Sequence, residues 1–143
     1  MNSNSIYIFR KTNITGQIVS KKQTTYSAVL GVVLSNARKQ RNIEQGDMAK
    51  RMGLSQASYS RLESGKSSFS VDQMYMASMA LGLPHNEITS RLNNTVKELR
   101  DGGIDVLPLM RGNATGNKDH TELGALVAGA ALGALVFSLF SNK

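Results

Sequence analysis

Apolar side chains recur every three or four residues in several stretches of the chain, which is the spacing of amphipathic helices. The first stretch covers residues 26–41, where Leu30, Val33, Leu34 and Ala37 fall on one face. Three of the last four residues of this stretch are Lys or Arg, and cations are favourable at the negative end of a helix dipole. The pattern therefore predicts a first helix with one buried face.

Four more helices are predicted by the same spacing. Their ranges and inward positions are 44–52 with Met48, Ala49 and Met52; 55–64 with Ala57 or Ser58, then Tyr59 and Leu62; 71–81 with Met74, Tyr75, Ser78 and Leu81; and 86–101 with Ile88, Leu92, Val96 (or Thr95) and Leu99. Ser55 and Asn86 suit the N-cap position, while Gly53 and Gly82 suit helix ends that need a left-handed residue. Residues 26–101 are thus predicted to form one helical domain.

The apolar stripe of helix 86–101 is narrow, and two interpretations fit it. It packs onto its own domain, or it forms a dimer seam like a short coiled coil. We favour self-packing because a helix of this length rarely pairs alone.

The segments outside the five helices carry weaker patterns. Residues 1–25 are expected to form an N-terminal arm, in which Ile6–Phe9 and Gln17–Val19 are spaced for a short hairpin. Residues 102–121 have no helical period and are rich in Gly, Asn and Thr towards their end, so a flexible linker is expected there.

Residues 122–143 hold a separate C-terminal hydrophobic helix. The run Leu123–Phe140 contains one polar residue, and 18 helical residues span roughly 27 Å, close to the bilayer core of roughly 30 Å. Ala125, Gly129 and Gly133 are spaced four apart, a pattern that lets helices approach closely in a membrane. We favour a transmembrane tail anchor in the bacterial inner membrane, with the basic domain in the cytoplasm. The alternative is an oligomerisation helix, or a tail that docks on a partner protein through residues 123–140.

Charge separates the two halves of the chain. Residues 1–66 hold 11 Lys or Arg and 3 Asp or Glu, whereas residues 67–143 hold 6 Lys or Arg and 7 Asp or Glu. A cationic surface favours contact with nucleic-acid phosphates, although it also serves solubility alone. The chain has no Cys and two His, and no nucleophile–base pair, phosphate-binding loop or metal-ligand spacing is present. We therefore expect no enzyme, no catalytic residues, no metal and no cofactor.

The spacing within residues 45–66 is specific for two crossed helices. Ala49 allows the helices to approach closely, and Gly53, four residues later, makes the turn between them. Apolar residues belong one, six and nine positions after that glycine, and Leu54, Tyr59 and Leu62 occupy them. This arrangement sets the second helix at the angle that enters a DNA major groove.

Here the chain resembles the helix-turn-helix family of phage repressors, Cro and bacterial XRE-type regulators. The resemblance covers about residues 28–88 and is carried by LGVVLSNARKQRNI, EQGDMAKRMGLSQASYSRLESGK and VDQMYMASMALGL. It implies an all-α fold, a compact repressor-like bundle of five helices. It also implies binding to double-stranded DNA as a homodimer.

Several roles follow from the resemblance by position. Gln56, Ala57 and Arg61 would read bases, since glutamine pairs with adenine and arginine with guanine. Contacts that bind phosphate or position the helix would come from Gln45, Ser58, Ser60 and Lys66. In the family, the counterpart of Gln45 bonds a phosphate or steadies the reading glutamine. Arg38 and Glu63 match a buried salt bridge that is structural.

The leading functional interpretation is a transcriptional regulator that binds an inverted repeat as a dimer and is tethered by its C-terminal helix. Two alternatives remain. One is a membrane-linked adaptor whose helix-turn-helix domain binds protein, and the other is an antitoxin-like autorepressor.

Overall fold

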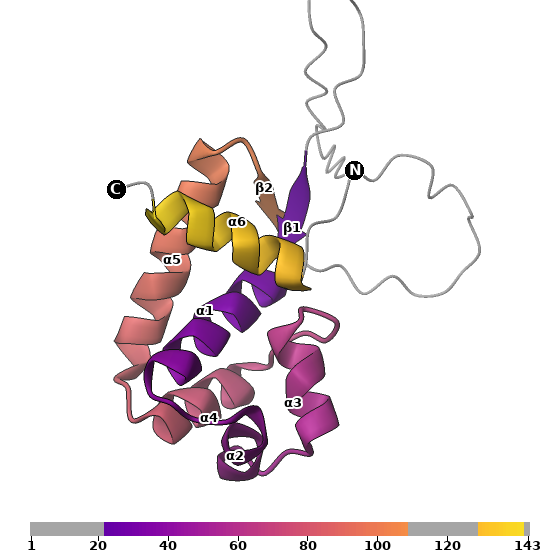
Figure 1. Ribbon diagram of the computed structural model, residues 1–143, viewed down its shortest axis with the longest axis vertical. Helices are drawn as coiled ribbons and strands as arrows, with labels where there is room; N and C mark the ends of the chain where they lie inside the picture. Colours follow the sequence, from indigo (N-terminus) through magenta and orange to yellow (C-terminus); the bar gives the residue numbers. More distant parts are fainter. Residues whose placement is uncertain (1–21, 109–128, 142–143) are drawn as a thin grey trace, which may run out of the picture.

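The structure, a computed structural model, describes residues 22–108 and 129–141. Helices dominate this part of the chain, and a small sheet of two strands accompanies them (Figure 1). In chain order the elements are β1 (Gln23–Thr25), α1 (Tyr26–Gln40), α2 (Gln45–Arg51), α3 (Gln56–Glu63), α4 (Val71–Leu81), α5 (His85–Asp101), β2 (Asp105–Leu107) and α6 (Gly129–Ser141). The predicted all-α bundle with a helix-turn-helix is confirmed, and its five helices are α1 to α5.

Side chains from all five bundle helices form the first apolar core. Its buried members are Leu30, Leu34, Ala37, Met48, Ala49, Met52, Tyr59, Ala77, Leu81 and Ile88. Most of these positions carry the helical spacing of the sequence, so periodicity predicted them correctly. Burial of this apolar surface is the main force that holds the short helices α2 and α3, which would be marginal in isolation.

Local hydrogen bonds fix where the helices begin and end. The Thr25 hydroxyl accepts a hydrogen bond from the Ala28 amide at the start of α1. Ser70 and Gln73 form a reciprocal capping box at the start of α4. Helix α5 begins at His85, with Pro84 in the N-cap position, so the predicted cap at Asn86 was misplaced.

The strands β1 and β2 pair in parallel, with Thr24 opposite Val106. Val106 and Ile104 are buried beside α1 and α5, in a second core cluster. Residues 102–107 were expected within a flexible linker, and this part of the prediction is wrong, because the segment is folded onto the domain. The expected hairpin of Ile6–Phe9 and Gln17–Val19 lies outside the described residues.

Helix α6 lies across α1 and α5, far from α2 (Figure 1). Its first residue lies close to the end of α3, since a Cβ on Gly129 would lie 3.7 Å from the Ser64 carbonyl oxygen. Leu132 and Val136 are buried in the second core cluster, together with Ala28, Val29 and Val32 of α1. The contacts of this helix are therefore with its own domain, an arrangement that the sequence did not indicate.

The expected membrane anchor is not supported by the described structure. Of the predicted helix of residues 123–140, the described part is α6, Gly129–Ser141, with 13 residues; residues 123–128 lie outside the described residues. Among residues 22–108 and 129–141, no helix combines the length and the hydropathy of a membrane span. Gly129 begins α6 with a positive φ of 60°, and a Cβ added to Gly133 would meet no atom within 4 Å among the described residues. Ala125 lies outside the described residues.

Two predictions about helix faces are decided by burial. Ile88, Val96 and Leu99 of α5 are buried in their own domain, so the favoured interpretation of self-packing is correct. Tyr75, by contrast, was expected inside and is 47% exposed. The inward face of α4 is instead formed around Ala77, Ser78 and Leu81.

Candidate nucleic-acid interface

The turn between α2 and α3 has the geometry that its sequence spacing requires. Gly53 has a φ of 64°, in the left-handed region where a Cβ is strained. The amide of Leu54 donates to the Ala49 carbonyl at 2.9 Å and so closes the end of α2. Ala49 is buried, and its small side chain leaves space for the two helices to cross.

Helix α3 presents a polar row on one side and an apolar row on the other. The Ser55 hydroxyl accepts from the Ser58 amide at 3.1 Å and caps the helix. Tyr59 and Leu62 are buried and attach α3 to the bundle. The exposed positions are Gln56, Ala57, Ser58 and Arg61. The expectation that Ala57 or Ser58 points inward is therefore wrong, because the buried side chains of α3 are Tyr59 and Leu62.

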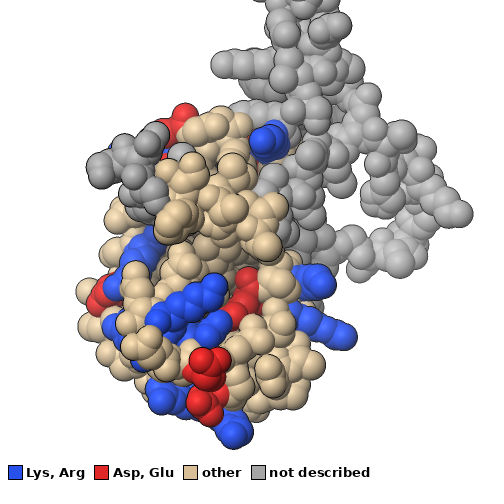
Figure 2. Space-filling model, in the orientation of Figure 1, with Lys and Arg blue, Asp and Glu red and all other residues tan. Residues whose placement is uncertain are grey.

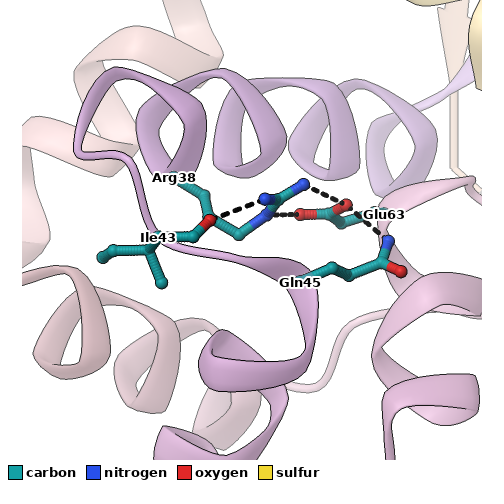
Figure 3. Close-up of polar contacts among 4 residues, drawn as sticks. All are labelled: Arg38, Ile43, Gln45 and Glu63. Atoms are coloured by element: carbon teal, nitrogen blue, oxygen red, sulfur yellow. Dashed lines mark hydrogen bonds and ion pairs between the residues drawn. The ribbon is translucent and has the colours of Figure 1, made fainter.

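A buried ion pair joins α3 to α1 (Figure 3). Arg38 donates from Nε to Oε1 of Glu63 at 2.7 Å and from Nη2 to Oε2 at 3.2 Å. Its remaining nitrogen, Nη1, donates to the Ile43 carbonyl at 2.7 Å. The two side chains are 9% and 8% exposed. The structure thus contains the pair that the resemblance implied, in the bidentate form that fixes both position and angle.

Gln45 belongs to the same network. Its Nε2 donates to Oε2 of Glu63 at 2.9 Å, so the start of α2 is tied to the end of α3 (Figure 3). The family role expected for this residue was a contact with phosphate or with the reading glutamine. In the structure its amide nitrogen holds Glu63, and the contact with DNA stays a prediction.

The protonation of the network follows from these contacts. Burial by itself raises the pKa of the Glu63 carboxyl, but hydrogen bonds from Arg38 and Gln45 outweigh it and lower that pKa below its ordinary value of 4.5. The hydrogen bond to Glu63 raises the pKa of Arg38. Burial, followed by the nearby Glu63 charge, raises the pKa of the Tyr59 hydroxyl, which is buried without a hydrogen-bond partner among the described residues. The pair is therefore charged and the phenol neutral at physiological pH.

Glycine at position 31 lets α1 and α3 touch backbone to backbone. A Cβ on Gly31 would lie 2.5 Å from the Glu63 carbonyl oxygen and 2.6 Å from that of Leu62. Gly65, just after α3, is equally close to α1, since its Cβ would lie 2.7 Å from that of Ala28. Sequence analysis missed Gly31, because a glycine within an apolar helical run gives no local sign of a crossing.

Basic side chains gather around the helix-turn-helix. Figure 2 shows many Lys and Arg side chains over the half of the molecule that contains α2 and α3, whereas the surface of α6 carries no charge. The exposed cations of α2, α3 and the position just after them are Lys50, Arg51, Arg61 and Lys66, and Glu44 and Asp47 at the start of α2 are exposed acids. Arg61 on α3 and Lys66 just after it are the cations placed to attract a polyanion to the exposed side of α3.

The remaining predicted contact residues lie at the edge of this face. Lys66 is exposed immediately after α3, and Ser60 is half-buried. The Ser58 hydroxyl accepts from the Ser55 hydroxyl at 2.9 Å, so part of its hydrogen-bonding capacity is used within the helix start. Gln56 leans towards α2, because a Cβ on Gly46 would lie 3.7 Å from its Oε1. Within residues 22–108 and 129–141, no three acidic or His side chains are grouped as a metal site would require.

Comparison with known proteins agrees with this geometry. A family model described as helix-turn-helix matches residues 34–88. No curated protein matches the chain. Among solved structures, the clp gene regulator ClgR from C. glutamicum is 20% identical, with a TM-score of 0.47 over 49% of this chain and 91% of that one. A point mutant of the restriction-modification controller protein C.Esp1396I is 14% identical, with a TM-score of 0.49 over 51% of this chain and 95% of that one.

The family match begins within α1 and ends at the start of α5, so it includes both motif helices and the Arg38–Glu63 pair. It agrees with the helix-turn-helix geometry of α2 and α3. Residues 34–88 are therefore similar to the helix-turn-helix family, and α2 and α3 are the two helices of the motif.

Proposed function

We propose that this protein is a transcriptional regulator that binds a specific double-stranded DNA sequence as a homodimer and has no enzymatic activity. The observation that carries the proposal is the exposed polar row of α3, which is held rigidly from behind. A recognition element must present its side chains at fixed positions, and α3 is fixed by buried Tyr59, Leu62 and the Arg38–Glu63 pair.

In this proposal α3 enters the major groove with its N-terminal end first. Gln56 pairs with an adenine through N6 and N7, Ala57 contacts a thymine methyl group, and Arg61 reads a guanine or binds phosphate. Ser58, Ser60 and Lys66 contact phosphates along the groove, which sets the register of the helix. Gln45 acts behind the interface, by holding Glu63.

Regulation follows from occupancy of the site. A dimer bound over a promoter excludes polymerase, and a dimer bound beside it recruits polymerase. Two copies related by a two-fold axis would place their α3 helices about one helical turn of DNA apart, roughly 34 Å, so the site would be an inverted repeat.

The test starts by selecting bound sequences from a pool of random duplexes with the full chain. Affinity for the selected site is then measured for Gln56→Ala and Arg61→Ala, with Asn93→Ala and Lys97→Ala as controls on exposed positions of α5. We expect each α3 variant to bind about 10-fold or more weakly and to lose preference at one position, as loss of a bidentate base contact does. The α5 variants are expected to bind like the parent.

Lys66→Ala provides a separate readout. A phosphate contact contributes to all sequences alike, so this variant is expected to weaken binding uniformly and to reduce the salt slope by about 1. Absence of any retarded complex at low salt, with the parent chain folded, would exclude the proposed function.

A further inference from the structure

An apolar stripe runs along the surface of α4. Val71, Tyr75 and Met79 are spaced four residues apart and are 68%, 47% and 74% exposed. This spacing places them on one face of the helix, away from the face that buries Ala77 and Leu81. Apolar side chains in a continuous row on a surface mark a contact surface more often than isolated ones do.

The centre of the stripe is held in a fixed conformation. The Tyr75 ring stacks on His85, with ring centroids 4.0 Å apart and planes 6° from parallel. An aromatic ring that is already ordered loses little entropy on binding, which is why such rings are effective at interfaces. Tyr75 is therefore prepared for contact with another surface.

We propose that this stripe is the surface through which two copies of the chain associate, with the α4 helices packed antiparallel. The inference deepens the proposed function and rests on it, because an inverted repeat calls for a two-fold pair of reading helices. The alternative seam on α5 is not free for this role, since Ile88, Val96 and Leu99 are buried within their own domain.

The spacing of the stripe is self-complementary. In a two-fold contact, whatever residue i touches on the other copy must touch residue i in return. With Tyr75 on the axis, an antiparallel arrangement packs Tyr75 on Tyr75 of the second copy. It also packs Val71 on Met79 at both ends of the stripe, so large and small apolar side chains alternate across the contact.

Charges beside the stripe select the antiparallel direction. Positions 72, 76 and 80 lie along one flank of the stripe, again four residues apart. Asp72 is exposed at the N-terminal end of this flank, and Arg51 lies at the other end, where its Nη1 donates to the Ala80 carbonyl at 3.1 Å. An antiparallel two-fold pair brings each flank against itself in reverse, so Asp72 approaches Arg51 of the second copy. A parallel pair would place the Asp72 ends of the two α4 helices side by side, so Asp72 would not approach Arg51 of the second copy.

The size of the stripe sets the strength of the association. Three side chains offer a few hundred square ångströms on each copy, below the roughly 800 Å² per partner of a standard stable interface. The dimer is therefore weak in free solution, and adjacent half-sites on DNA strengthen it by holding two copies together.

One test compares two substitutions that remove the same kind of exposed side chain. Met79 and Phe137 are 74% and 73% exposed, on α4 and α6 respectively. We expect Met79→Lys to weaken self-association, measured by sedimentation equilibrium of the full chain, by about 10-fold or more. Phe137→Lys is expected to leave it unchanged. Circular dichroism on both variants confirms that the fold is intact.

A second test uses the absence of cysteine from the chain. Tyr75→Cys places one thiol on the proposed axis, so oxidation is expected to link two copies through a disulfide. Val71→Cys or Met79→Cys alone is expected to link poorly. In the proposed dimer the same residue of the two copies lies roughly 12 Å apart along the direction of the α4 helices, beyond the reach of a disulfide. An equal mixture of these two variants is expected to link one to the other.

The outcomes separate this inference from the proposed function. A monomer at all concentrations and on DNA, or a dimer that Met79→Lys leaves intact and Tyr75→Cys does not link, overturns the α4 contact even if DNA is bound. A dimer linked through Tyr75→Cys that binds no DNA supports the contact and contradicts the regulator. A complex with a different protein that Met79→Lys disrupts, in a chain that stays monomeric, also overturns the inference.

Discussion

Helices α3 and α6 both pack on α1, but they are attached in different ways. Helix α3 is joined by a backbone crossing at Gly31 and by a buried bidentate ion pair between Arg38 and Glu63. Helix α6 is joined by apolar side chains, with Leu132 and Val136 buried, and it contains no charged residue. Ion pairs and backbone contacts have strict geometry, whereas apolar burial is non-directional. The difference shows which of the two helices needs a fixed orientation, and it is the one that faces DNA in our proposal.

Breaking the ion pair has the largest expected effect. Arg38→Ala leaves the Glu63 carboxylate buried without its cation, so we expect the free energy of unfolding to fall by about 3–5 kcal/mol in chemical denaturation. Arg91→Ala is the matched control, since it removes an arginine from an ion pair with Glu87 that is 35% and 38% exposed. The free energy of unfolding of this control variant is expected to fall by less than about 1 kcal/mol. Equal losses in the two variants would contradict the distinction.

Filling the crossing at Gly31 comes next. Gly31→Ala places a Cβ against backbone atoms of α3 that cannot move independently. We expect the free energy of unfolding to fall by about 3 kcal/mol and DNA binding to weaken, because α3 is displaced. Gly133→Ala is the control on α6, where no atom of residues 22–108 and 129–141 outside the helix's own backbone lies within 4 Å of the added Cβ. It is expected to stabilise by roughly 0.5–1 kcal/mol, because alanine favours helix over glycine. A stable Gly31→Ala variant with parental affinity would show that the crossing is not tight.

Shortening a side chain under α6 tests the other half of the comparison. Leu132→Ala is expected to weaken the docking of α6 by about 2 kcal/mol. Hydrogen exchange should then become faster in the amides of α6 and remain slow in those of α3, since the hydrogen bonds described for the Arg38–Glu63 network involve no residue of α6. Faster exchange in both helices would mean that α6 supports α3, and the comparison would have to be revised.

Acid is a milder probe of the ion pair. The Glu63 pKa is lowered on folding, so the stability that this carboxylate contributes is present above its unfolded value near 4.5 and is lost as pH falls through the lower folded value. We expect thermal unfolding temperatures to fall in that acidic range. In Glu63→Gln, which has no group to titrate there, the pH dependence is expected to be flatter, although the variant is less stable at neutral pH.

The features that sequence predicted are those encoded locally. The inward positions of α1 and α2, the turn at Gly53 and the cap at Ser55 depend on neighbours within a few residues. The pairing of Arg38 with Glu63 has no local signal, and it followed from the resemblance instead. Helix α3 was placed correctly, but the choice of Ala57 or Ser58 as inward was wrong, because the helix buries Tyr59 and Leu62 on the other side.

The features that sequence missed depend on distant contacts. Gly31 matters only because the end of α3 passes over it, and β1 and β2 are too short to show a strand pattern. Tyr75 was expected inside because its ring is apolar and its spacing suits a buried face. The bundle packs on the neighbouring face of α4 instead, and the Tyr75 ring stacks on His85 at the surface. The apolar run of α6 did not indicate that this helix packs on α1 and α5. Apolar contacts are non-directional, so they require no matching charges that could be recognised in the sequences of the two surfaces.

The parallel pairing of β1 with β2 has a consequence for the order of folding. It joins Thr24 to Val106 and so closes a loop that contains all five bundle helices. Closing a loop of this length is slow and entropically unfavourable, whereas the helices form through contacts between near neighbours. We expect the strands to pair after the transition state, so that Val106→Ala accelerates unfolding in stopped-flow measurements and leaves the refolding rate unchanged. The β1–β2 pair, which joins the two ends of the five-helix segment, is then the last part of that segment to assemble and the first to open.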